Sequence, residues 1–133
     1  MKRRYFLAAL AAALLTAGPA LAAPPTVEIV AMAHPPVVAA LKPLRAWLAE
    51  QGKKLKVVEV DAESVQGGKR LEAVGLRGHV PVVILIDGQY RHSLKDGRAV
   101  AFANFPDVEG APPGVRGKWT TADVQALLRA RMK

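Results

Sequence analysis

Residues 82–86, Val-Val-Ile-Leu-Ile, decide the fold; they follow Gly-Leu-Arg-Gly-His-Val-Pro at 75–81 and precede the turn Asp87-Gly88. Five apolar residues in succession, without alternation, are typical of a strand that is buried on both of its faces. A run this short, bounded by turn residues, favours a strand over a helix. We therefore expect residues 82–86 to form the centre of a sheet.

A strand and a helix are predicted near the start of the chain. Residues 26–32 are rich in Val and Ile and stop at His34-Pro35-Pro36, where two prolines preset a turn or a helix start. The next apolar residues recur at spacings of four, three and four, which predicts a helix with one buried face: Val37, Leu41, Leu44 and Leu48. Pro43 is expected to kink this helix, and Gly52 to end it.

The rest of the chain adds further elements. Residues 55–60 are predicted to be a strand and residues 66–76 a weaker helix. The dipeptides Asp87-Gly88 and Asp96-Gly97 are hairpin signals and predict antiparallel strands at 90–94 and 98–102. The final helix is indicated by a capping-box pattern and an apolar stripe: Thr120, Asp123, Val124, Leu127 and Leu128. We expect an α/β fold with the order β-α-β-α-β-β-α.

Three segments resemble the thioredoxin family. Residues 75–88 are similar to the segment that contains the family's cis-proline, with one extra residue, so that Pro81 takes its place. Pro43 resembles the family's helix-kinking proline, and residues 117–120 resemble the entry to its final helix. The likeness covers most of residues 26–132. It implies a thioredoxin-like three-layer sandwich with a central mixed sheet, and a cis bond at Val80–Pro81 that leaves backbone groups free to pair with an extended peptide.

The resemblance fails at the redox site. Where the family has Cys-x-x-Cys, this chain has His-Pro-Pro-Val-Val at 34–38, and its sequence contains no cysteine. Attack on a disulfide needs a thiolate, so the protein is not a thiol–disulfide oxidoreductase. A second departure is the stretch 89–113, which is longer than the family's simple hairpin and is either a decoration of the sheet edge or a partner-binding surface.

The first residues are typical of an export signal. Residues 1–4 carry three positive charges, residues 5–15 are apolar, and Ala20-Leu21-Ala22 supplies the small residues of a cleavage site. Gly18-Pro19 interrupts the apolar run before the roughly 20 residues needed to span a membrane. We expect a signal peptide at 1–22 and a thioredoxin-like domain at 23–133. That domain would be periplasmic or secreted and not integral to the membrane; the export route stays open, general secretory or twin-arginine.

The charge of the chain narrows the class of partner. The formal net charge is +8, of which the leader supplies three positive charges, so the mature chain is moderately basic. A basic face suits an acidic partner protein or an anionic lipid surface. Nucleic acid is disfavoured, because the chain is predicted to be exported and has few aromatic side chains on which bases stack.

The candidate binding surface follows from the thioredoxin-like resemblance. It is formed by the turn before the first helix, the loop before the buried strand and one tryptophan: His34, Pro35, Pro36, His79, Val80, Pro81 and Trp119. Trp47 is assigned to the core, beside the apolar stripe of the first helix. We assign no catalytic residue and no cofactor, because acidic residues at strand ends and turns are commonly recruited for local hydrogen bonds.

The predicted function is binding of an extended polypeptide or a periplasmic partner protein, without redox chemistry. One alternative is copper or zinc binding through His34 and His79, although a stable site needs three or four ligands. The simpler interpretation is that His34 caps a helix and that His79 lies in solvent, so we assign no metal. A thiol-independent enzyme of unknown reaction is the remaining alternative, and the oligomeric state is left open.

Overall fold

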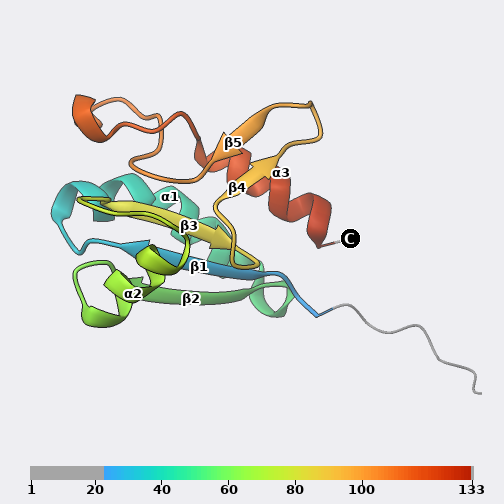
Figure 1. Cartoon of the computed structure of the whole chain (residues 1–133). Helices are drawn as coiled ribbons and strands as arrows, with labels where there is room; N and C mark the ends of the chain where they lie inside the picture. Colours follow the sequence, from blue (N-terminus) through green and yellow to red (C-terminus); the bar gives the residue numbers. More distant parts are fainter. Residues whose placement is uncertain (1–22, 133) are drawn as a thin grey trace, which may run out of the picture.

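The computed structural model describes residues 23–132, so the predicted signal peptide at 1–22 lies outside the described part of the chain. The protein is a mixed α/β structure (Figure 1). Its elements are β1 (Thr26–Ala31), α1 (Pro35–Glu50), β2 (Lys56–Asp61), α2 (Val65–Ala73), β3 (Val82–Ile86), β4 (Arg91–Ser93), β5 (Ala99–Ala101) and α3 (Thr121–Arg131), with short 3₁₀ helices at Gly52–Lys54 and Pro113–Val115. None of the helices in this range has the length and hydropathy required to cross a membrane.

The main sheet has the order β2-β1-β3, with β1 parallel to β2 and antiparallel to β3. The central strand is therefore β1, and the expectation that residues 82–86 lie at the centre of the sheet is wrong. β3 is nevertheless fully buried, and the chain returns along its second edge. There the N–H of Ile84 donates to the carbonyl of Phe102 over 2.9 Å, and the N–H of Asn104 donates to the carbonyl of Val82 over 2.8 Å.

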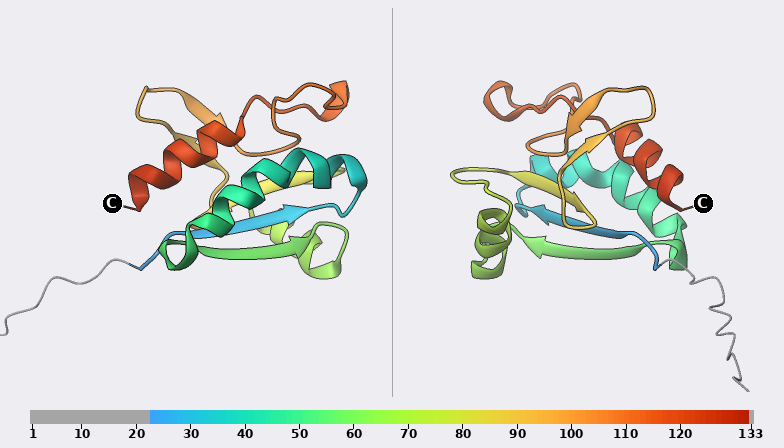
Figure 2. Two further views of the ribbon diagram at one scale, coloured as in Figure 1. Left: turned by 180° about the vertical axis from the view of Figure 1, so that it is seen from behind. Right: turned by 45° about the vertical axis from the view of Figure 1, so that its right-hand side comes forward.

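Helices cover both faces of this sheet. α1 and α3 lie on one face and α2 on the other (Figure 2). The predicted stripe of α1 is confirmed, since its buried residues are Val37, Leu41, Leu44 and Leu48. The helix begins at Pro35, and Gly52 follows its end with φ of +54°, a left-handed conformation that favours glycine. The side chain of Trp47 is partly buried against the core, and the Arg129 guanidinium of α3 lies over its ring.

The chain after β3 contains both strands predicted at 90–94 and 98–102, although the order β-α-β-α-β-β-α counts one strand fewer than these ranges. The Asp96-Gly97 hairpin is confirmed, since β4 and β5 pair with each other. Asp87 and Gly88 form a turn closed by a single bridge between Ile86 and Gln89, but β4 does not pair with β3, so β4 and β5 form a two-stranded ribbon of their own. Asp87 and Gly88 have φ of +49° and +82°, as a type I′ turn requires. The segment after β5, which contains Phe102, returns to pair with β3 along its outer edge.

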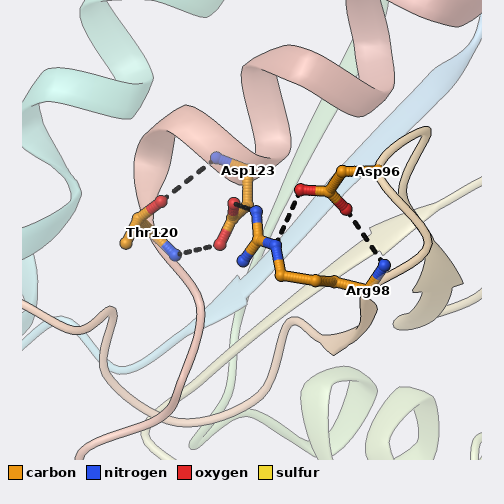
Figure 3. A network of polar contacts seen from close by, with 4 residues as sticks. All are labelled: Asp96, Arg98, Thr120 and Asp123. Atoms are coloured by element: carbon orange, nitrogen blue, oxygen red, sulfur yellow. Dashed lines mark hydrogen bonds and ion pairs between the residues drawn. The ribbon is translucent and has the colours of Figure 1, made fainter.

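A polar network connects the ribbon to α3 (Figure 3). The guanidinium of Arg98 donates to Asp96 within the ribbon turn over 2.8 Å and to Asp123 of α3 over 2.9 Å. Asp123 is buried and also accepts from the backbone N–H of Thr120, while its own N–H donates to the Thr120 hydroxyl. The predicted capping box is therefore confirmed. The capping box satisfies backbone donors at the start of α3. The contact of Arg98 with Asp123 connects this helix to the β4–β5 turn.

α2 approaches the sheet closely because of a glycine and a buried acid. A Cβ atom placed on Gly67 would lie 2.0 Å from the carbonyl oxygen of Asp61, so only glycine fits here. On the same face of the sheet, the buried carboxylate of Glu28 in β1 forms a two-bond ion pair with the guanidinium of Arg70 in α2. This pair satisfies a charge that would otherwise be costly at the centre of the sheet.

Gly67→Ala is expected to destabilise the protein by about 1–3 kcal/mol, because the added methyl group collides with the backbone at the end of β2. Gly68→Ala is the matched control: a Cβ there meets nothing within 4 Å, so it should be neutral or stabilise the helix by up to about 1 kcal/mol. Urea unfolding of both variants measures the difference. Equal free energies of unfolding for the two would contradict the close contact of α2 with β2.

Candidate functional site

The two loops of the predicted binding surface lie together at one end of the sheet. The backbone N–H of Met32 donates to the carbonyl of Pro81 over 2.9 Å, which places the loop before β3 beside the turn that precedes α1. His34, Pro35, Pro36 and His79 are exposed at this end, whereas Val80 and Pro81 are buried.

The expected cis-proline surface is absent. No peptide bond within residues 23–132 is cis, so the Val80–Pro81 bond is trans and the prediction is wrong. With a trans bond the chain runs on in an extended form into β3, and the Pro81 carbonyl is taken up by Met32 instead of facing solvent. The Pro81 carbonyl is therefore already paired and is not free to bind an extended peptide.

The prediction that Trp119 belongs to an exposed binding surface is also wrong. Its side chain is fully buried, with 0% of its surface accessible, and its ring packs edge-on against Phe102 with centroids 5.7 Å apart. Its indole N–H donates to the carbonyls of Ala103 and Asn104 over 3.2 and 3.1 Å. The residue holds the returning segment beside β3 and is part of the core.

In the described part of the chain, the structure does not place enough further metal ligands beside His34 and His79 to complete a metal site. The Nε2 atom of His34 lies 2.5 Å from Oε1 of Glu63, and the side chain of His34 makes no capping hydrogen bond to α1. Within residues 23–132 there is no group of three or more His, Cys, Asp or Glu side chains that is arranged to hold a metal ion. The geometry therefore does not favour the metal-binding alternative.

A surface pocket of about 570 Å³ lies beside the β4–β5 ribbon, with His92 and Arg131 in its wall. Nε2 of His92 lies 2.8 Å from the carbonyl of Gln89, and Nδ1 lies 3.3 Å from a guanidinium nitrogen of Arg131. Arg131 also pairs with Asp87 over 2.8 Å. These contacts fit a neutral imidazole that donates from Nε2 and accepts at Nδ1, and they connect α3 to the turn after β3.

The neutral state of His92 makes stability depend on pH. Burial lowers the pKa of His92 below its usual value, and the charge of Arg131 acts in the same direction, against the opposing effects of the Gln89 carbonyl and Asp87. The unfolded chain therefore takes up a proton at higher pH than the folded chain, so this contribution to stability is present above the usual histidine pKa of about 6.5 and is lost as the pH falls.

We expect the free energy of unfolding to decrease between about pH 7.5 and pH 5.5, and the decrease to be smaller in His92→Gln, whose amide keeps a donor and an acceptor but does not titrate. Urea unfolding at the two pH values measures this. The comparison with the variant isolates the contribution of His92. An identical pH dependence in both proteins would show that His92 is not held neutral.

The most open backbone in the main sheet belongs to β2. This strand lies at the edge of the sheet, and its residues are exposed apart from Val60, which is half-buried. The N–H groups of Lys56 and Ala62 donate toward β1, to Pro25 and Ala31, over 2.9 Å each. Because the direction alternates along a strand, Val57, Glu59 and Asp61 turn their N–H and C=O groups away from β1. Ser64 occupies the Asp61 carbonyl, which leaves the groups of Val57 and Glu59 facing outward.

Side chains on this edge combine apolar surface with charge. Val57 and Val58 are 42% and 36% exposed, although both are large and apolar. The side chain of Glu59 pairs with Arg45 of α1 over 2.6 Å. Lys53 and Lys54 lie just before β2, and Lys56 is its first residue. Asp61 is the last residue of the strand. We call the six residues Lys56–Asp61 the β2 edge.

Sequence reasoning identified this strand but missed its exposure. The β-branched residues of 55–60 predicted a strand, and this is confirmed with a shift of one residue. The charged residues Lys56, Glu59 and Asp61 among the valines were the available signal, since charged residues are common on edge strands. It was not used, because a sequence pattern by itself does not say which strands become neighbours.

Comparison of the chain with protein-family models, with curated proteins and with solved structures finds no match. Function is therefore inferred from the residues and the geometry described above.

Proposed function

We propose that this protein is an exported polypeptide-binding module without redox activity, which accepts an extended segment of a partner protein as an additional strand on the β2 edge. The observation that carries the proposal is the outward-facing backbone of Val57 and Glu59 on a strand that pairs with β1 alone among the described segments. In strand addition, main-chain hydrogen bonds supply affinity and alternate side chains supply selectivity.

The proposed domain, residues 23–133, has a thioredoxin-like fold. Support comes from the order β2-β1-β3, the pairing of the segment around Phe102 with the outer edge of β3, and the helices on both faces of the sheet. Pro43 lies inside α1, as the resemblance requires. The leader at 1–22 supports export to the periplasm, where a chain without cysteine is unaffected by disulfide exchange.

The energetic argument rests on the valines as well as the backbone. Each new main-chain hydrogen bond adds only about 1 kcal/mol, because the free groups are already hydrated. Covering the exposed parts of Val57 and Val58 adds the hydrophobic contribution that makes docking favourable. The simpler alternative is an edge protected from pairing by Lys56 and Glu59, since natural sheets guard their edges with charge.

Val57→Pro tests the proposal directly. The N–H of Val57 faces away from β1, so proline at this position removes an outward donor without removing a hydrogen bond of the sheet. Val57→Thr is the matched control, because it keeps the N–H and the branched shape of the side chain.

We expect peptides selected from a random twelve-residue display library to bind the parent and Val57→Thr with dissociation constants of about 1–100 μM. Affinity for Val57→Pro should be lower by about tenfold or more, while circular dichroism shows an unchanged fold. Failure to select any peptide, or equal binding by a folded Val57→Pro protein, would contradict strand addition at β2. Glu59→Pro gives a second test at the other outward position if Val57→Pro does not fold.

A further inference from the structure

The charges along the β2 edge define the class of segment that fits it. We infer that the docked segment runs antiparallel to β2 and carries carboxylates at its C-terminal end, which lies against Lys53, Lys54 and Lys56. This inference rests on the proposed function and adds to it the direction and the chemistry of the partner segment.

The lysines at the start of β2 are available for a partner. Lys53, Lys54 and Lys56 are all exposed, and none of them takes part in an ion pair within residues 23–132. They lie in the 3₁₀ turn and at the first residue of the strand, so one end of the edge is positively charged. Carboxylates brought to this end gain charge-assisted contacts without breaking an existing pair.

The acidic side chains near the other end are already engaged. Oδ1 of Asp61 accepts from the backbone N–H of Glu63 over 2.9 Å, and Glu63 pairs with His34 over 2.5 Å. Glu59 pairs with Arg45. A partner therefore finds three cations at the start of β2 that are unpaired within the described range, whereas two of the three acids toward its end, Glu59 and Glu63, already pair with a basic side chain. This asymmetry favours one direction of docking.

The two ends are far enough apart for the asymmetry to act. Six residues of a strand extend over roughly 20 Å, about twice the Debye length at physiological ionic strength. A carboxylate at one end of the docked segment therefore responds mainly to the charges at that end. Antiparallel pairing is slightly more stable per residue than parallel pairing, so acidic residues at the C-terminal end of the segment meet the lysines.

A second copy of this chain fits the edge less well. In an antiparallel pair of β2 strands, the lysines of one copy would face the C-terminal end of the other copy's β2. The carboxylates there belong to Asp61 and Glu63, which are held by the Glu63 backbone and by His34. Glu63 already has a basic partner, so a second copy would offer the lysines one carboxylate that lacks a cation among the described residues, that of Asp61. A separate segment with two or more free carboxylates at its C-terminal end neutralises more of this positive charge.

The test uses three amidated, N-acetylated fluorescent peptides that share the centre Thr-Val-Thr-Val-Thr. One carries two glutamates at its C-terminal end, the second carries them at its N-terminal end, and the third has two glutamines at its C-terminal end. Binding is measured by fluorescence anisotropy at physiological ionic strength and again with added salt. The proteins compared are the parent, Val57→Pro, the double variant Lys53→Glu with Lys54→Glu, and a control with the same change in net charge, Lys95→Glu with Lys118→Glu, whose lysines lie in the ribbon turn and before α3.

We expect the peptide with C-terminal glutamates to bind the parent about fivefold more tightly than the other two, and this preference to decline with added salt. The preference should disappear in the Lys53 and Lys54 variant and persist in the control variant. Equal affinity for the three peptides, with binding still lost in Val57→Pro, would overturn this inference and leave the proposed function intact. A preference for N-terminal glutamates would overturn the antiparallel direction.

Two further outcomes would also decide against the inference. If none of the three peptides binds the parent, the acidic class is wrong, and the display selection with Val57→Pro then shows separately whether the edge binds polypeptide at all. If sedimentation shows that the parent is a dimer and Val57→Pro is a monomer, the edge is occupied by a second copy of the chain and not by a separate partner.

Discussion

The pairing of β1 with neighbours on both of its edges is the constraint on which the rest of the structure depends. Its register with β2 and β3 sets which side chains point to each face of the sheet. Val27 and Ile29 are fully buried, and Ile29 lies on the face opposite to Glu28, which meets Arg70 of α2. A shift of one residue in this register would bring the charge to the wrong face. The positions of α1 and α2 therefore follow from β1.

The two strands beside β1 differ in whether their outer edge is paired, and this difference creates the candidate site. The outer edge of β3 is covered because Trp119 and Phe102 hold the returning chain against it. β2 receives no such cover from the described segments. The same sheet thus has one edge that is closed by the core and one edge that keeps hydrogen-bonding groups, exposed valines and unpaired lysines in solvent. A binding function fits the open edge, because it offers backbone hydrogen-bonding groups for affinity and the positive charge of its lysines for selectivity.

The predicted binding loop shows how a residue pattern can be identified and its role misjudged. The loop before β3 and the turn at His34 lie together, but the trans bond at Pro81 and its hydrogen bond to Met32 make the loop part of the sheet's framework. Trp119 illustrates the same point, because its indole N–H finds two carbonyls inside the protein. A tryptophan with an internal hydrogen-bond partner is stable in a core, so its polar edge does not by itself indicate an interface.

Local signals in the sequence determined the secondary structure. The stripe from Val37 to Leu48, the Asp-Gly turns and the capping box at Thr120 act between residues that are close along the chain, so these elements were predictable within a few residues. Only the tertiary structure decided that β1 is central, that β4 and β5 form a separate ribbon, and that β2 is left with an open edge. The reason is physical: strand order and edge exposure depend on contacts between distant segments, and valines in an edge strand and in an inner strand look alike in sequence.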